Sequence, residues 1–474
     1  MFLIKYNSQG NLVWAKSFGN TGDEVPSDME IDSNGFLYVL GYFESPTLNF
    51  DTITLVNSSM NRAKEIFVTK FDSNGNVIWA RSFGSHSEEW PHSITLDNIN
   101  NIYITGYYSG TVVFDSISIP YVPGGGDIFL TKLDNSGNVI WAKGFGGNSF
   151  DIGIALATDH TNGVYITGTF RSDTLNFGST SLYNSGTSGG TDIFIAKIDA
   201  AGNPIWAKSC VSVDWESIED ACSDADGNFI ISGTYQSPTI IIDSDTLFNN
   251  SAGFRDIFIL KIDVSGNILW SNSTGGTDND YGFGIYSDQN DNIYLTGNFA
   301  SPIAQFDTIS LPYNGGFFIA KYDLNGHILW AISPGDSSGY GQVRAISVNS
   351  NDDIFITGSY AGTLNLGQVS TPIGNGNFFS AKLNMITGIN EINNDKVINC
   401  FPNPWSTFTT IRSDMDFLNE DFSLMNLLGQ EIIKVNGYTG ESFYLHRDNL
   451  ESGIYFLKII ERGGRTSTIK MIIQ

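Results

Sequence analysis

Acidic and aromatic residues recur in the short segments that link one repeating phrase of this sequence to the next. Carboxylates accept hydrogen bonds from hydroxyl groups or bind cations, and aromatic faces stack on sugar rings or apolar side chains. The residues that could do this chemistry are Asp23, Glu24, Glu88, Trp90, Asp151, Asp214, Trp215, Asp280, Tyr281 and Tyr340, with Glu89, Phe150 and Glu216 in the same segments. We predict that they surround one mouth of the fold and bind a polysaccharide or a protein ligand.

A purely structural role explains the same residues. In that alternative, each acid caps the start of a strand and each aromatic ring fills the space between neighbouring sheets. An enzyme that acts on polysaccharides is a further alternative, because such an enzyme needs paired carboxylates or a Tyr and His constellation on one face.

Other chemically active residues form no recognisable site. The five histidines stand at unrelated positions of the repeat and belong to no H-E-x-x-H motif: His86, His92, His160, His327 and His446. Cys210, Cys222 and Cys400 lack metal-ligand spacing. Cys210 and Cys222 either pair in an oxidising compartment or remain buried thiols. The sequence predicts no catalytic residue, no metal and no cofactor.

The elements that position the acidic and aromatic residues come from a repeat of about 63 residues. Its register is marked by six tryptophans, Trp14, Trp79, Trp141, Trp206, Trp270 and Trp330. Each repeat holds a phrase such as DIFIAKIDAAGNPIWAKS and a second phrase such as NIYLTGNF. Their apolar and polar residues alternate as in strands that lie between neighbouring sheets, so each period holds at least four strands.

A D-x-x-G-N motif separates the two strands of the first phrase. Its Asp accepts hydrogen bonds from backbone amides, and its Gly and Asn tolerate a positive φ, so the motif predicts a hairpin turn. Calcium ligation is the alternative for this Asp, but an EF-hand loop needs about six oxygen donors and a distal Glu that the motif lacks.

Composition agrees with an all-β fold, since hydrophobic residues make up 41%, charged residues 16%, and Gly, Phe and Tyr are abundant. Four strands per repeat predict radially arranged blades, that is, a β-propeller with six or seven four-stranded antiparallel blades. A phrase such as SPTLNFDTITL adds a β-excursion between the second and third strands, and we expect it to share one face with the linking segments.

The strand count predicts five complete blades, over residues from about 24 to 335. The N-terminus adds a third and a fourth strand, and the segment before residue 384 adds a first, a second and a third. Six blades result if LVWAKSFG completes the last blade. Seven result if the natural chain extends upstream, and we favour this interpretation because Met1–Gly10 lacks the features of a signal peptide.

These phrases resemble the SBBP-type β-propeller repeat of bacterial surface and secreted proteins. The resemblance covers residues 1–384, because each unit repeats several motifs in the same order. It implies a propeller that serves as a scaffold for binding or adhesion. A structural component of a surface layer is a third possible function.

The repeat ends at residue 384, and a polar linker is expected over residues 385–399. Residues 400–474 then alternate apolar and polar residues between turn signals, which predicts a small immunoglobulin-like β-sandwich. Its motifs are formed by Pro402, Asn403, Pro404, Gly429, Gln430, Gly453, Tyr455 and Lys470. They resemble the C-terminal sorting domain, type A, of the type IX secretion system of Bacteroidota. A generic accessory domain is the alternative.

The sorting resemblance implies the type IX secretion machinery as a partner and a secreted or outer-membrane location. The formal charge of −26 disfavours binding to nucleic acid or anionic membranes. The sequence also holds no stretch of about 20 apolar residues that would span a membrane.

Overall fold

The computed structural model describes residues 1–59, 62–161, 163–185, 190–243, 245–249, 251, 253–313, 316–334, 339–366, 369–371, 374–383, 398–401, 405–426, 430–460 and 466–473. Every regular element among them is a β-strand, which confirms the all-β prediction. Contacts divide the chain into two compact units, Met1–Leu383 and Asn384–Gln474. Within the described residues no helix is long and apolar enough to cross a membrane.

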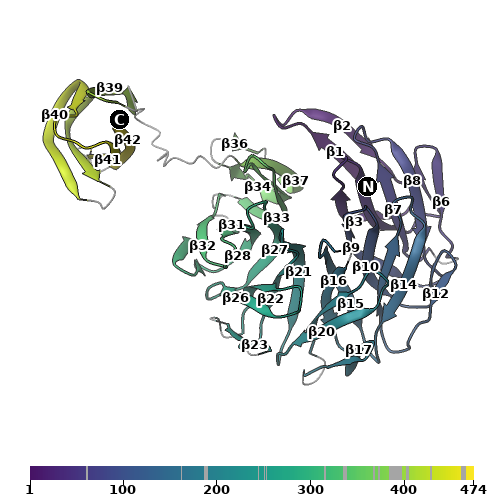
Figure 1. Cartoon of the computed structure of the whole chain (residues 1–474). Helices are drawn as coiled ribbons and strands as arrows, with labels where there is room; N and C mark the ends of the chain where they lie inside the picture. Colours follow the sequence, from purple (N-terminus) through teal and green to yellow (C-terminus); the bar gives the residue numbers. More distant parts are fainter. Residues whose placement is uncertain are drawn as a thin grey trace. The chain divides into compact units, whose positions relative to one another are not determined.

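Five complete blades lie in the first unit (Figure 1), each a four-stranded antiparallel meander in sequence order. Blade 1 contains β3 (Glu24–Ile31), β4 (Leu37–Phe43), β7 (Glu65–Phe71) and β8 (Val77–Phe83). Blade 2 contains β9 (Glu89–Leu96), β10 (Ile102–Tyr108), β13 (Asp127–Leu133) and β14 (Val139–Phe145). Blade 3 contains β15 (Asp151–Thr158), β16 (Val164–Phe170), β19 (Asp192–Ile198) and β20 (Pro204–Cys210).

Blade 4 contains β21 (Glu216–Ser223), β22 (Phe229–Tyr235), β25 (Asp256–Ile262) and β26 (Ile268–Thr274). Blade 5 contains β27 (Asp280–Ser287), β28 (Ile293–Phe299), β31 (Phe317–Tyr322) and β32 (Ile328–Ile332). Because neighbouring strands are antiparallel, every inner strand starts at one end of its blade, the linking face, and ends at the other, the turn face. The third strand of each blade runs in the same direction as the inner strand.

Incomplete sheets stand before blade 1 and after blade 5. The first is the hairpin of β1 (Phe2–Tyr6) and β2 (Leu12–Ser17), and the last is the sheet of β33 (Gly339–Val348), β34 (Ile354–Gly362) and β37 (Gly374–Leu383). Since β2 pairs with β1 and not with β37, the closure that would give six blades is not the one observed. The hairpin takes a blade position of its own, so the described residues of the unit form seven blade positions, two of which hold fewer than four described strands.

Tryptophan contacts explain why the hairpin occupies a separate position. In blades 1 to 4 the indole N–H of the fourth strand donates to a carbonyl in the D-x-x-G-N turn of the next blade, as Trp79 does to Asn135 O at 3.1 Å. Trp14 in β2 donates to Ser73 O of blade 1 at 3.2 Å in the same way. The turn glycine packs on this ring, because a Cβ on Gly137 would lie 3.1 Å from Trp79.

The D-x-x-G-N motifs form the turns between third and fourth strands, as predicted. In blade 1, Asp72 Oδ1 accepts the backbone N–H groups of Asn74 and Asn76 at 2.9 and 2.8 Å. Gly75 has a φ of 79°. The aspartate oxygens are therefore occupied by the turn itself.

The β-excursions are two-stranded hairpins between the second and third strands. They are β5 (Thr47–Phe50) with β6 (Ile53–Val56), β11 (Val112–Phe114) with β12 (Ile117–Ile119), β17 (Thr174–Phe177) with β18 (Thr180–Tyr183), β23 (Thr239–Ile242) with β24 (Asp245–Phe248), β29 (Ile303–Phe306) with β30 (Ile309–Pro312), and β35 (Asn365–Leu366) with β36 (Val369–Ser370). They leave the linking face and run along the outer strands, so that Asp115 at one tip accepts from Val139 N at the start of β14. As expected, the hairpins also contact the linking segments, since Val113 of β11 pairs with Gly84, and they cover the outer edge of each complete blade.

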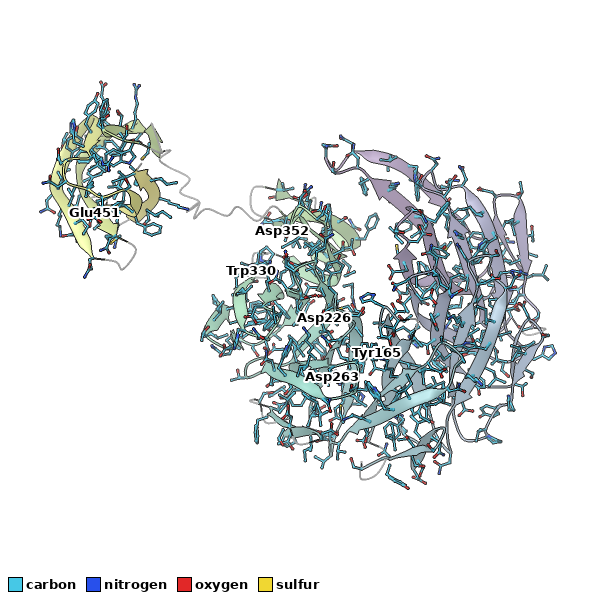
Figure 2. The ribbon with its side chains drawn as sticks, in the orientation of Figure 1. Tyr165, Asp226, Asp263, Trp330, Asp352 and Glu451 are labelled. Carbon is cyan, nitrogen blue, oxygen red and sulfur yellow. The ribbon has the colours of Figure 1, made fainter. Side chains whose placement is uncertain are left out.

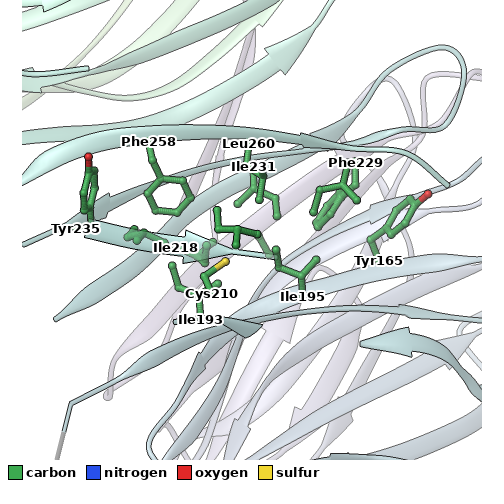
Figure 3. Close-up of a cluster of buried hydrophobic side chains, with 14 of the residues drawn as sticks. Tyr165, Ile193, Ile195, Cys210, Ile218, Phe229, Ile231, Tyr235, Phe258 and Leu260 are labelled. Atoms are coloured by element: carbon green, nitrogen blue, oxygen red, sulfur yellow. The ribbon is translucent and has the colours of Figure 1, made fainter. Parts of the chain in front are cut away.

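The core consists of apolar layers between neighbouring blades. In the layer of Figure 3, Tyr165, Ile193 and Ile195 of blade 3 pack with Ile231 and Phe258 of blade 4. Tyr165 also donates its hydroxyl to Gly227 O of blade 4 at 2.8 Å (its position is labelled in Figure 2). The cysteines Cys210, Cys222 and Cys400 are free thiols.

The second unit is one sheet folded over its own core. Its strands are β38 (Ile398–Phe401), β39 (Phe408–Asn426), β40 (Glu431–His446), β41 (Gly453–Ile460) and β42 (Thr466–Ile473). The long strands β39 and β40 pair with several register shifts, so their two ends belong to different halves. Trp405, Phe417, Phe422 and Leu457 are buried between the halves, as in the predicted sandwich.

Candidate functional site

The acids that begin the inner strands are held by serine residues at the linking face. Asp151 Oδ2 accepts the hydroxyl of Ser172 at 2.6 Å, and Asp280 Oδ2 accepts that of Ser301 at 2.8 Å. Glu24 accepts from Ser45 in the same arrangement. Asp151 and Asp280 are completely buried, so they do not face solvent as the predicted mouth requires, and their contacts are those of strand caps.

The acids just before these strands are exposed on this face: Asp23 and Glu88, one residue before Glu24 and Glu89, and Asp214, two residues before Glu216. Glu88 Oε2 accepts the indole N–H of Trp90 at 3.2 Å, and Glu88 Oε1 lies 3.9 Å from Lys64 Nζ. These three side chains remain accessible to a ligand in solvent.

Two groups of aromatic and basic side chains flank the predicted mouth. In the Lys64 group, Lys64 Nζ lies 4.1 Å from the Trp90 ring centroid, and Trp90 stacks on Tyr107. Tyr107 in turn meets Phe150 edge to face, with centroids 4.8 Å apart. Trp90 is half-buried, so its ring packs at the boundary of blades 1 and 2 and exposes only part of its surface.

The Arg255 group is the equivalent at the boundary of blades 4 and 5. The Arg255 guanidinium lies 4.0 Å from the Trp215 centroid and 5.6 Å from the Tyr281 centroid, and it donates to the Tyr281 hydroxyl at 3.1 Å. Tyr281 also stacks on Phe283. The predicted residue Tyr340 lies in β33, but its side chain is outside the described residues.

A central cavity that the sequence did not reveal lies among the inner strands. Each inner strand has a register shift, which lies near the fourth residue in blades 1 to 5, such as between Gly153 and Ala155, and around Arg344 in β33. A β-bulge re-aims the side chain it carries. The cavity has a volume of about 310 Å³ and is lined by Ser27, Asp28, His92, Ser93, Ile154, Ala155, Glu219, Asp220, Phe283, Arg344 and Ala345.

Backbone amides hold two carboxyl groups in this cavity. Ile94 N donates to Asp28 Oδ2 at 2.9 Å, and Ile285 N donates to Asp220 Oδ2 at 3.0 Å. Burial raises the pKa of Asp28 to about 6 and that of Asp220 to about 7. Both groups therefore change charge near neutral pH, because removal from water disfavours the ionised form.

The other charged groups around the cavity respond to the same burial. Burial raises the pKa of Glu219 to about 7, against the opposing effect of Arg344, and burial and Asp28 raise that of Glu30 to about 7. Burial lowers the pKa of His92 to about 4, so its ring is neutral at pH 7. The Arg344 guanidinium lies 4.3 Å from the Phe283 centroid. Carboxyl, hydroxyl and guanidinium groups of this kind can hydrogen-bond a polar ligand.

Among the described residues, no group of three or more His, Cys, Asp or Glu side chains is arranged to hold a metal ion. The residue types that line the cavity also differ from blade to blade, so no motif in the sequence marks them. Each bulge adds one extra residue to its inner strand, such as Ile154 between Gly153 and Ala155, and no residue type marks that position.

The C-terminal unit places part of its motif in the described residues. Gln430 N donates to Asn426 Oδ1 at 3.0 Å in the turn between β39 and β40, Gly453 begins β41, Tyr455 lies in β41 and Lys470 lies in β42. Pro402, Asn403, Pro404 and Gly429 lie outside the described residues.

Residues 399–474 match the secretion system C-terminal sorting domain. The sorting domain marks its chain for export by the type IX system, so the protein is secreted or displayed at the cell surface. The match covers the sandwich alone. The SBBP-type repeat of the propeller stays a prediction.

Two curated proteins resemble the chain at low identity. One is an uncharacterised WD repeat-containing protein of Acanthamoeba polyphaga mimivirus, 25% identical over 434 residues, covering 74% of this chain and 31% of that protein. The other is the regulatory protein FlaEY of Caulobacter vibrioides, 24% identical over 136 residues, covering 29% of this chain and 14% of that protein. The chain thus spans less than a third of the length of either relative.

Solved structures with similar folds include the Pan2 WD40 domain of Neurospora crassa, with 8% identity, a TM-score of 0.38 and coverage of 71% of this chain and 75% of that one. An apocarotenoid oxygenase of Synechocystis has 10% identity and a TM-score of 0.34, with coverage of 84% and 76%. Such low scores add nothing to the functional argument.

Proposed function

We propose that the propeller is an extracellular binding module whose ligand is a glycan, and that the sorting domain delivers it outside the cell. The central cavity is the observation that carries the proposal. Inner strands from six blade positions each direct a bulged side chain into one polar space, which a scaffold without a ligand does not require. Carboxyl and hydroxyl groups there, such as those of Glu219, Asp220 and Ser93, suit the hydroxyl groups of a sugar.

The linking face would extend this site. The exposed acids Asp23, Glu88 and Asp214 and the half-buried rings of Trp90, Trp215 and Tyr281 offer hydrogen-bond acceptors and stacking surface around the cavity. The acids that begin the inner strands, Glu24, Asp151 and Asp280, would act on the ligand only indirectly, by holding these strands in place. Tyr340 is the corresponding aromatic residue in β33.

Glycan-array binding by the purified full chain tests this function. We expect Glu219→Gln and Arg344→Gln to weaken binding at least about tenfold, because each removes a charge-assisted hydrogen bond in a sheltered site. His327→Gln, an exposed change at the turn face, is the matched control and should bind as the wild type does. Equal binding by all four proteins would remove the cavity from the site. Binding of a protein but no glycan would place the ligand in another class.

The rings at the linking face are tested separately. Trp90→Ala and Trp215→Ala should weaken glycan binding if the exposed parts of the rings stack on the ligand. Undiminished binding in both variants, with reduced thermal stability, would assign these rings to packing between blades.

A polysaccharide-degrading enzyme is the second candidate, favoured by one observation. Burial raises the pKa of both Glu219 and Asp220 to about 7, a value that suits a general acid at neutral pH. Release of reducing ends from a panel of polysaccharides by the wild type, and its loss in Glu219→Gln and Asp220→Asn, would establish the enzyme. Binding without any release supports the binding module.

Export is proposed to depend on the motif residues from Pro402 to Lys470, with residues 385–399 as a linker between the propeller and the sorting domain. Deletion of residues 401–474 should leave the protein inside the outer membrane of a host that carries the type IX machinery. Surface display that survives the deletion would show that another segment directs export.

A further inference from the structure

Buried carboxyl groups meet in pairs at the boundaries between blades. In each pair, one acid begins the third strand of a blade and the other begins the inner strand of the next blade. The pairs are Glu65 with Glu89, Asp127 with Asp151, Asp192 with Glu216, and Asp256 with Asp280. All eight side chains are at least nine-tenths buried.

Backbone hydrogen bonds bring the members of a pair together. Asp151 N donates to Gly126 O, the carbonyl just before Asp127, at 2.8 Å, and Glu89 N donates to Lys64 O, just before Glu65, at 3.1 Å. The linking loop passes beside both carboxyl groups on a glycine at two of these boundaries, because a Cβ on Gly84 would lie 2.6 Å from Glu65 Cγ and 3.0 Å from Glu89 Oε2. A Cβ on Gly275 would lie 2.4 Å from Asp256 Oδ1 and 3.1 Å from Asp280 Oδ2. Each pair therefore occupies one small, shared space.

Oxygen atoms in these spaces lack partners. Glu89 Oε2, Asp127 Oδ1 and Glu216 Oε2 are fully buried and accept no hydrogen bond in good geometry from the described residues, and the Ser212 hydroxyl lies beside Glu216. A buried polar atom that is left unpaired costs free energy, and a buried charge costs more. The three boundaries from blade 1 to blade 4 thus each present at least one carboxyl oxygen that needs a partner.

No basic side chain fills that need at these three boundaries. All lysine and arginine residues of Met1–Leu383 lie in the described part of the chain, and none forms an ion pair with Glu65, Glu89, Asp127, Asp151, Asp192 or Glu216. The missing positive charge must come from outside the chain, as a proton or as a cation.

We propose that calcium ions bind at the three blade boundaries that join blades 1 to 4, between the paired carboxylates. The unpaired carboxyl oxygen at each boundary, the remaining lone pairs of the other acid, and neutral hydroxyl and carbonyl oxygens of the loops would supply the hard oxygen set that Ca²⁺ takes. The pairs mix Asp and Glu and so differ in shape, which the flexible coordination of Ca²⁺ tolerates better than the strict octahedron of Mg²⁺. Weak calcium sites suit an exported protein, because extracellular modules bind at about 10⁻⁴ to 10⁻³ M.

Calcium binding to the full chain tests this proposal. Protein stripped with EDTA is dialysed against CaCl₂ at pH 7.5, and bound calcium is measured by atomic emission and by isothermal titration. We expect about three calcium ions per chain and a melting temperature roughly 5 °C or more above that in EDTA. Equal ionic strength of NaCl or MgCl₂ should raise it less. A melting temperature and calcium content that do not depend on CaCl₂ would overturn the proposal and leave the pairs protonated.

A matched pair of variants locates the ions. Asp127→Asn should lose one calcium ion and part of the calcium-dependent rise in melting temperature, whereas Asp226→Asn, an exposed Asp at the turn face (Figure 2), should lose neither. Equal calcium content in both variants would overturn the assignment to the boundary of blades 2 and 3. If Asp127→Asn fails to fold, Glu216→Gln at the next boundary serves in its place, and the wild-type measurement stands regardless.

Discussion

The two ends of blades 2 to 5 bury acidic side chains in opposite ways. At the turn face of these blades, the acid after the inner strand forms an ion pair with a lysine of the third strand, as in Asp97 with Lys132 at 3.2 Å and Asp224 with Lys261 at 2.8 Å. At their linking face, the acid that begins the inner strand is buried against an acid of the preceding blade. One end carries its counter-charge in the chain, whereas the other depends on a proton or an ion from the solvent.

One repeat thus combines buried ion pairs, whose contribution to stability hardly changes with the solvent, and acid pairs, whose contribution depends on the pH and ions of the solvent. The Asp224–Lys261 pair is nearly inaccessible, with side-chain exposures of 1% and 4%, so neither salt nor pH near neutrality changes it much. Lys261 also helps to hold the pKa of Asp224 below its ordinary value, with Asn228 and against the effect of burial. The acid pairs of the linking face have no such partner, so the boundaries between blades should respond to the medium.

The largest expected effect comes from breaking an ion pair of the turn face on one side. Lys261→Met leaves Asp224 buried without a counter-charge and should lower the free energy of unfolding of the propeller by about 3 to 5 kcal/mol. Urea unfolding followed by tryptophan fluorescence measures it. The double variant Lys261→Met with Asp224→Asn should lose less than Lys261→Met alone, and a larger loss in the double variant would contradict this account.

The next largest effect is a difference between the two faces in the sign of the stability change that an Asp→Asn substitution causes. In EDTA, Asp97→Asn should destabilise the propeller, because it leaves Lys132 unpaired, whereas Asp127→Asn should stabilise it or change it little, because it removes one of two adjacent carboxyls. Thermal unfolding of both variants beside the wild type gives the comparison. Destabilisation of similar size by both changes would mean that the two ends are not electrostatically different.

The central cavity provides an intermediate case, in which backbone amides hold the carboxyl groups. Burial raises the pKa of Asp220 from 3.8 to about 7, so the folded state keeps a proton that the unfolded chain releases. Stability should therefore fall as the pH rises from about 4 to 7, by at most about 1.4 kcal/mol per pH unit for this group. Asp220→Asn should flatten the dependence of urea midpoints on pH across this window, and an unchanged slope would contradict the assignment.

The smallest effect is expected at an ion pair near the surface. Lys208 and Asp243 form a salt bridge with side-chain exposures of 25% and 46%, so water and salt screen it. Asp243→Asn should change the free energy of unfolding by less than about 1 kcal/mol, measured in the same urea experiment. A loss of stability as large as that of Lys261→Met would show that the burial of an ion pair does not determine how much it stabilises the propeller.

The local parts of the fold were predictable because local chemistry produces them. The D-x-x-G-N turns close through hydrogen bonds within five residues, such as those from Asn74 and Asn76 to Asp72, and the alternating strands follow from side-chain periodicity. The five complete blades and the added hairpins follow from repetition of these units. The course of the hairpins along the outer strands was not predictable, because it depends on packing between blades.

The candidate site was predictable only in part. The sequence located the acids and rings of the linking segments, but it did not distinguish Asp151, which a serine from another loop buries, from Glu88, which remains exposed. The central cavity was missed because its lining residues, such as Glu219 and Arg344, share no residue type. The acid pairs were missed because Asp127 and Asp151 belong to different blades.

The sequence by itself determined the repeat, its turns, the all-β class and the sorting domain at the C-terminus, since each rests on residues close together in the chain. Only the tertiary structure decided which carboxyl group meets a lysine, which meets another carboxyl group and which lines the cavity. The physical reason is that the charge state of a buried acid depends on neighbours some 20 to 70 residues away, such as Ser172 for Asp151 and Ile94 for Asp28, and on the water that the packed blades exclude.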